Sequence, residues 1–84
     1  MAQQILRLPA VQKLTGMSRS TIYLYIKKGL FPQPCKIGFR SVGWPLEEIN
    51  ALIDARVRGF NDSAIQGMVK EIIASRIASL PNAA

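Results

Sequence analysis

The 84-residue sequence predicts a mainly α-helical fold with one small β-hairpin. Apolar residues recur at helical spacing in four segments, and one stretch around Gly38 has two short apolar segments flanking a turn. The first two helical segments are short and are joined by a glycine-containing turn, ahead of the hairpin. This order matches a winged helix-turn-helix, with the hairpin as the wing, followed by an additional C-terminal amphipathic helix.

The first helix is predicted to begin at Pro9, because the fixed φ and missing N–H of proline suit the first helical position. It is expected to run to about Thr15, with Val11 and Leu14 facing the core. Residues 1–7 before it are expected to form a loose arm or a short strand.

The second helix is predicted between Ser18 and Gly29. Ser18 suits the N-cap, because its hydroxyl can accept a bond from a first-turn N–H, and Gly29 suits the left-handed residue that ends a helix. At about 100° per residue, one side should face the core and holds Ile22, Tyr25, Ile26 and Gly29. The opposite side carries Ser20, Leu24 and Lys27, with Arg19 and Tyr23 on one flank. Such a face suits a helix that reads DNA, although a solvated helix in any small domain has the same pattern.

Residues 35–44 are predicted to form the hairpin. Pro32 and Pro34 stop any helix before it, and Gly38 suits a tight turn. Lys36 and Arg40 then lie near the tip, where an arginine can contact a phosphate backbone or enter a minor groove. The alternative is a plain surface hairpin.

A third helix is predicted with Pro45 at its first position. Glu47 and Glu48 lie in its first turn, where the helix dipole favours carboxylates. They do not form a catalytic pair, because adjacent helical residues point apart. Trp44 is expected to anchor the core where the hairpin meets this helix.

A fourth helix is predicted after a break at residues 59–62, with Asn61 or Asp62 as its cap and Pro81 as its end. Two alternatives stay open for its apolar stripe: it folds back on its own domain, or it pairs with a second copy of the chain. The residues of this predicted oligomerisation stripe are Ile65, Met68, Val69, Ile72, Ile73 and Ile77. The chain is therefore divided into a winged domain, residues 1–58, and a C-terminal helix for packing or dimerisation, residues 59–84.

The whole chain has a net charge of +6, and its basic residues are concentrated in the first half. All five acids lie at or after Glu47, whereas residues 1–46 hold no acid. The basic residues of that half are Arg7, Lys13, Arg19, Lys27, Lys28, Lys36 and Arg40. This placement predicts a face that binds a polyanion, with chance segregation in a short chain as the less favoured alternative.

The composition disfavours several functions. The chain has one cysteine, Cys35, and no histidine. An internal disulfide and a four-ligand zinc site are therefore excluded, and Cys35 has no histidine to activate it as a nucleophile. No apolar run approaches the roughly 20 residues of a membrane helix, and no signal-peptide pattern is present. We therefore expect an intracellular protein that is neither an enzyme nor dependent on a cofactor or metal.

An ordered set of short motifs resembles the AlpA family of prophage regulators, which includes excisionase-like proteins. The motifs are RLP (7–9), LTG (14–16), SRSTIY (18–23), GLFP (29–32), KIG (36–38) and VGW (42–44), with Arg40 and Glu48–Ile49. The resemblance implies a MerR-like winged helix-turn-helix in a bacterial cytoplasm, acting in transcription regulation or as an excision directionality factor. It also implies that Arg19, Ser20, Thr21, Tyr23 and Lys27 belong to the recognition helix and that Lys36 and Arg40 belong to the wing.

The sequence departs from the family pattern at two places. Leu24 stands where a basic residue is usual and Tyr25 where an aliphatic one is usual. An apolar Leu24 could contact a thymine methyl group, or could simply be tolerated at this position. The fourth helix also exceeds the short tail of the family, so no family function carries over to it.

These observations predict a sequence-specific double-stranded DNA-binding regulator of a phage or mobile element. The predicted recognition set is Ser18, Arg19, Ser20, Thr21, Tyr23, Leu24, Lys27 and Lys28. The wing set is Lys36, Arg40 and Ser41, and Arg7 and Lys13 are expected to contact the DNA backbone. A homodimer or head-to-tail oligomer and an integrase or RNA polymerase are the expected partners. The alternative is a phage assembly or adapter module, in which the fourth helix binds a protein and DNA binding is weak.

Overall fold

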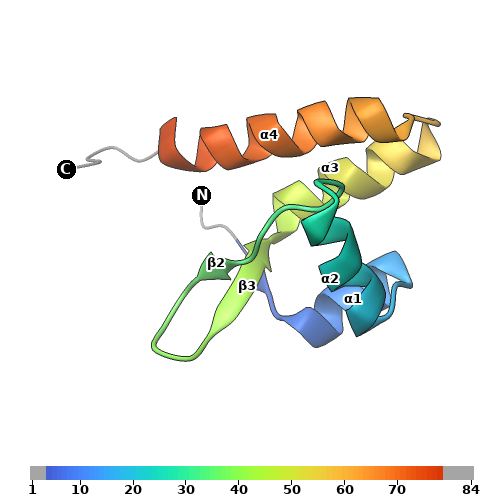
Figure 1. Ribbon diagram of the computed structural model, residues 1–84. Coiled ribbons are helices and arrows are strands. Elements are labelled where there is room, and N and C mark those ends of the chain that lie inside the picture. The colour runs from blue at the N-terminus through green and yellow to red at the C-terminus, as the bar shows by residue number, and fades with distance from the viewer. Residues whose placement is uncertain (1–3, 79–84) are drawn as a thin grey trace.

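The computed structural model describes the backbone of residues 4–78 and the side chains of residues 4–76. The order of elements confirms the predicted fold class: a helix-turn-helix, a small hairpin, and two further helices (Figure 1). The elements are β1 (Ile5–Leu6), α1 (Leu8–Thr15), α2 (Arg19–Lys27), β2 (Cys35–Lys36), β3 (Val42–Pro45), α3 (Leu46–Val57) and α4 (Asp62–Ala78).

Local signals set the ends of α1 and α2. Gly16 ends α1 with φ of 72°, and its N–H bonds to the Gln12 carbonyl at 2.8 Å. Ser18 then caps α2 through its hydroxyl, which accepts a hydrogen bond from the Thr21 N–H at 3.2 Å. Gly29, with φ of 78°, turns the chain out of α2. A side chain with a Cβ is strained at such angles, so both glycines are required by the backbone.

The three short strands form one antiparallel sheet in the order β1-β3-β2. Leu6 pairs with Trp44 and Lys36 pairs with Val42, so residues 5–6 of the predicted arm form a short strand. Pro45 was predicted to be the first residue of α3, and this prediction is wrong. Pro45 is the last residue of β3 and the N-cap of α3. The N–H of Leu46 donates to the Gln4 carbonyl at 2.7 Å. This long-range bond draws the start of α3 into the sheet.

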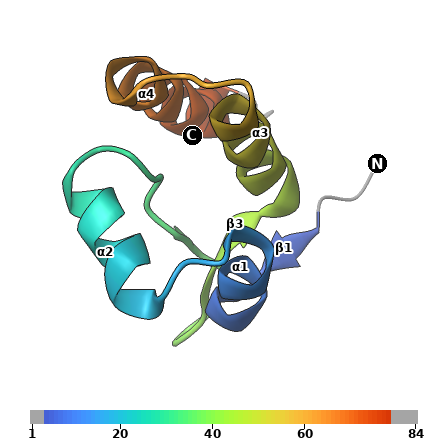
Figure 2. The ribbon, with the colours of Figure 1, turned by 90° about the vertical axis from the view of Figure 1, so that its right-hand side faces the viewer.

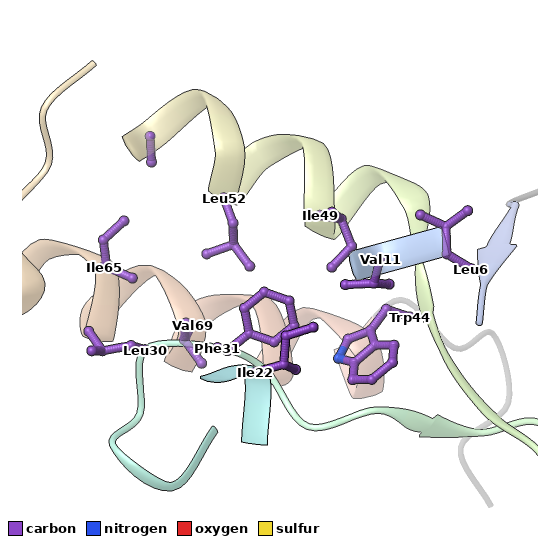
Figure 3. Close-up of a cluster of buried hydrophobic side chains, with 11 residues drawn as sticks. Leu6, Val11, Ile22, Leu30, Phe31, Trp44, Ile49, Leu52, Ile65 and Val69 are labelled. Carbon is purple, nitrogen blue, oxygen red and sulfur yellow. The ribbon is translucent and has the colours of Figure 1, made fainter. Parts of the chain in front are cut away.

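The core is built around Trp44, whose side chain is fully buried as predicted. Its indole Nε1 donates to the Pro32 carbonyl at 2.8 Å, and Phe31 meets its ring edge to face at 6.0 Å. Buried side chains from every helix surround this pair (Figure 3). The labelled residues include Val11, Ile22, Ile49, Leu52, Ile65 and Val69. Leu14, which was predicted to face inward, is 48% exposed instead, at the rim of an apolar groove.

The fourth helix folds back on the rest of the chain. Ile65 and Val69 are buried in the common core, while Met68, Ile72 and Ile73 are half-buried against it. α4 lies along α3 in both ribbon views (Figures 1 and 2). The apolar stripe therefore follows the first of its two alternatives, packing on its own domain. This packing uses the most deeply buried residues of the stripe, Ile65 and Val69. The division of the chain after residue 58 and contact with a second copy both stay predictions.

The start of α4 is capped as the sequence predicted. The Asn61 side chain accepts a hydrogen bond from the Ala64 N–H at 2.9 Å, so Asn61 is the cap rather than Asp62. The side chain of Ile77 and the predicted end at Pro81 lie outside the described residues.

Candidate nucleic-acid interface

The predicted recognition helix, α2, separates a buried face from an exposed one. Ile22 is fully buried and Tyr25 and Ile26 are half-buried, as the sequence predicted. The residues exposed on the other side are Arg19, Ser20, Tyr23, Leu24 and Lys27. α2 therefore presents a polar and basic surface while its apolar residues hold it on the core.

The first turn of α2 has fixed side chains. The hydroxyls of Ser18 and Thr21 share a hydrogen bond of 2.9 Å, in addition to the cap that Ser18 makes with the Thr21 N–H. The guanidinium carbon of Arg19 lies 5.9 Å from the ring centroid of Tyr23, one turn further on. A cation–π contact of this kind orients the arginine without neutralising it.

The two positions that depart from the family pattern differ in their surroundings. Leu24 is 47% exposed on the outer face of α2, so it is available for an apolar contact. Tyr25 lies on the inner side, where the guanidinium carbon of Arg56 from α3 is 5.8 Å from its ring centroid. The tyrosine thus serves packing between α2 and α3.

The wing is closed by a single carbonyl group. The Ser41 carbonyl accepts hydrogen bonds from the N–H of Ile37, at 2.9 Å, and of Gly38, at 3.3 Å. Lys36 and Arg40 are exposed as predicted, whereas Ser41 is half-buried at the closing pair. Phe39 at the tip is 89% exposed, and the guanidinium carbon of Arg40 lies 5.5 Å from its ring centroid.

The start of α2 and the tip of the wing lie on the same side of the molecule, away from α4 (Figures 1 and 2). α1, which carries Lys13 and follows Arg7, lies on this side too. The other end of α2 points toward α4, and Gln66 of α4 donates a hydrogen bond to the Lys28 carbonyl at 2.9 Å. The structure thus brings most of the predicted residues to one surface and places Lys27 and Lys28 at its edge.

The charges of this surface are not compensated by ion pairs within the described part of the chain. All seven cations of residues 1–46 are exposed, and none of them forms an ion pair with a residue among 4–78. The ion pairs in that range are Arg56–Asp62, Arg58–Asp54 and Arg76–Glu48, on α3, α4 and the turn between them. The positive field of the helix-turn-helix and wing therefore points into solvent.

Sequence reasoning missed two features that shape this surface. The hydrogen bond of Gln66 connects α4 to the end of α2 across 38 positions of the chain, and no local sequence pattern predicts such a contact. Phe39 lies in the predicted turn, but a lone aromatic residue there did not point to an exposed position.

The described part of the chain contains neither a candidate metal site nor a candidate membrane span. Among residues 4–78, no three His, Cys, Asp or Glu side chains gather closely enough to hold a metal ion. None of the described helices has both the length and the apolar character needed to cross a membrane.

The short helix pair and the hairpin wing place the chain in the winged helix-turn-helix class of proteins. The uncompensated basic surface is typical of the nucleic-acid-binding members of such a class. Residues 4–57 match the family described as Prophage CP4-57 regulatory protein (AlpA). The chain therefore belongs to the AlpA family of prophage regulatory proteins. The matched range ends at the last residue of α3, so α4 lies outside it.

Two relatives illustrate the match. The chain is 42% identical over 57 residues to an uncharacterized protein, ORF88, of Enterobacteria phage P4; the match covers 68% of this chain and 65% of that protein. It is 40% identical over 63 residues to the DNA-binding transcriptional activator AlpA of Escherichia coli (strain K12), covering 68% of this chain and 90% of the relative. The chain thus spans just under two thirds of the phage relative. No solved structure matches the chain.

Proposed function

We propose that the protein binds double-stranded DNA in a sequence-specific manner and regulates a prophage or related mobile element. The observation that carries this proposal is the exposed basic surface on which the start of α2 and the wing lie together, built from a stretch of the chain that holds no acidic residue. Membership of a family of prophage regulatory proteins supports it, as does the name of the Escherichia coli relative, a DNA-binding transcriptional activator.

The residues of this surface have distinct proposed roles. Arg19 reads a base, because a guanidinium can bond both acceptors of a guanine in the major groove. Ser20, Tyr23 and Leu24 contact neighbouring bases or the sugar-phosphate backbone. Lys36 and Arg40 of the wing bind phosphates, which position the protein without reading sequence.

The output of binding is transcription control, excision of the element, or both. The name of the Escherichia coli relative favours transcription control. Transcription control requires contact with RNA polymerase or altered promoter access, whereas excision requires that an attachment site be shaped beside an integrase. The adapter alternative needs α4 to be free for a protein partner. Burial of Ile65 and Val69 in the core speaks against that use of the helix.

Selection from a pool of random DNA duplexes at about physiological salt tests the proposal directly. We expect one short enriched motif that is lost in Arg19→Ala. Arg58→Ala is the matched control, because it removes the same charge from the far end of α3, where Arg58 pairs with Asp54 at 2.9 Å. The motif should be unchanged in that control.

The layout of the selected motif reports on assembly as well. Inverted half-sites indicate a symmetric dimer, and direct repeats indicate head-to-tail copies. If the pool yields no motif and binding depends only on salt, sequence-specific regulation is refuted and the basic surface is a general DNA grip.

A further inference from the structure

The tip of the wing carries an apolar side chain that the proposed roles leave unused. Phe39 is 89% exposed, the highest value among the large hydrophobic side chains that the structure describes. Val57 follows at 79%, and the remaining ones are less than half exposed. A single exposed apolar side chain is ordinary on a protein surface, so the ring becomes a candidate contact only through what its surroundings show.

The hairpin holds this ring at a fixed place. Since the Ser41 carbonyl takes the N–H groups of both Ile37 and Gly38, only Gly38, Phe39 and Arg40 project beyond the last bonds of the wing. The base of the wing is clamped at Gly43, where an added Cβ would lie 2.6 Å from Ile5 Cγ2 and 2.8 Å from the Leu6 carbonyl oxygen. The tip is therefore a short, anchored projection rather than a long loop.

The charges around the tip indicate what covers the ring. Arg40 lies against the ring at 5.5 Å, and Lys36 is exposed on the adjoining strand. No acidic residue occurs before Glu47 in the chain. An apolar ring in contact with an arginine, on a hairpin that contains no acidic residue, suits a partner that presents stacked, flat, apolar surfaces behind a row of negative charges. Duplex DNA has this character, with base pairs lying behind its phosphates.

We propose that Phe39 is a wedge that enters the minor groove and inserts partly between two base pairs, while Arg40 and Lys36 bind the flanking phosphates. This inference rests on the proposed DNA binding and adds a mechanical consequence to it. Apolar wedges of this kind unstack one base step and kink the duplex by roughly 20–90° toward the major groove. Flexible pyrimidine–purine steps kink most easily, so Phe39 adds specificity for such a step without a hydrogen bond to any base.

The wedge is tested on a duplex of about 20 base pairs that carries the selected motif at its centre, with donor and acceptor dyes at its ends. Saturating wild-type protein should shorten the distance between the dyes. 2-Aminopurine placed at the kinked step should brighten as it unstacks. Phe39→Ala should lose both effects and bind about 5- to 150-fold more weakly, the range for removing an aromatic ring that stacks on a base.

Two variants separate the ring from its neighbours. Phe39→Leu should retain most of the kink, because leucine also serves as a wedge. Arg40→Ala should bind more weakly and with a shallower salt dependence, yet still kink the duplex at saturation. Phe39→Ala should unfold at the wild-type temperature, since the ring it removes is 89% exposed.

The outcomes distinguish the wedge from the DNA binding on which it rests. If Phe39→Ala kinks the duplex as the wild type does with unchanged affinity, the wedge is refuted, and the exposed ring becomes a candidate contact for a protein. A wild-type complex that is straight, with silent 2-aminopurine, refutes the wedge alone. A wild-type chain that binds no duplex overturns both proposals.

Discussion

Arg76 on α4 grips Glu48 on α3 with two hydrogen bonds: its Nη2 donates to Oε1 at 2.6 Å and its Nε donates to Oε2 at 2.8 Å. The side chains are only 20% and 13% exposed, so water competes weakly for them. Two parallel bonds also fix the angle between the groups. The pair therefore fastens the C-terminal half of α4 to the start of α3, 28 positions away in the sequence.

We expect Glu48→Gln to lower the free energy of unfolding by about 1.5–3 kcal/mol, the range for a hydrogen bond to a charged group. Glu47→Gln is the matched control, because Glu47 lies in the same turn of α3 but is exposed. It should cost less than about 0.5 kcal/mol. Urea unfolding measures both values, and equal losses would show that charge at the helix start matters rather than the pair.

Titration of Arg76 should not change the contribution of this pair to the free energy of unfolding between about pH 6 and pH 9. Its hydrogen bonds to Glu48 raise the pKa of Arg76 above the ordinary value of an arginine, against the opposing effect of burial. A group whose pKa is raised on folding stabilises the fold fully at any pH below its pKa in the unfolded chain. This stabilisation is lost only as the pH rises through its pKa in the folded protein. Both limits lie far above neutral pH. A loss of the Glu48→Gln effect on raising the pH from 6 to 9 would contradict this account.

The core position of Ile65 predicts that α4 is needed for the stability of the whole protein. Ile65 is fully buried, so Ile65→Ala should lower the free energy of unfolding by about 2–5 kcal/mol and Ile65→Val by about 0.5–1.5 kcal/mol. Ser63→Ala, at an exposed position of the same helix, is the control. An unaffected Ile65→Ala protein would show that α4 does not pack on its own domain in solution.

Two glycines predict opposite effects of the same substitution. Gly43→Ala should destabilise the fold by about 1–3 kcal/mol, because its Cβ would push against Ile5 and the Leu6 carbonyl at less than contact distance. Gly67→Ala should stabilise it by about 0.5–1 kcal/mol, because nothing lies within 4 Å and the position is inside α4. Thermal unfolding of both variants gives the signs. A neutral Gly43→Ala would mean that β1 does not pack against β3 as described.

The sequence predicted those parts of the fold that depend on neighbouring residues. The cap at Ser18, the glycine ends of α1 and α2 and the buried face around Ile22 all follow from local chemistry or from helical spacing, and the structure has each of them. The same reasoning found the exposed face of α2, because the residues of a helix that do not face the core must face outward.

The features that sequence reasoning did not find depend on contacts between distant residues. Pro45 suits either the first position of a helix or a strand, and the bond from Leu46 to Gln4 decides for the strand. The contacts of Gln66 with Lys28 and of Arg76 with Glu48 span 38 and 28 positions, beyond any periodic pattern. The exposure of Phe39 is likewise known only once the core has been filled by other aromatic residues, Phe31 and Trp44.

Lys36 tests the proposed division between residues that read sequence and residues that only hold DNA. Lys36→Ala should weaken binding to the selected site and to random duplex alike, by about 1 kcal/mol for one phosphate contact in water. The slope of log affinity against log salt should become shallower by about 0.9. Lys70→Ala removes the same charge from an exposed position of α4 and should change neither quantity. If Lys36→Ala instead weakens only the selected site, the wing reads bases and the assignment of Lys36 to the phosphate backbone is wrong.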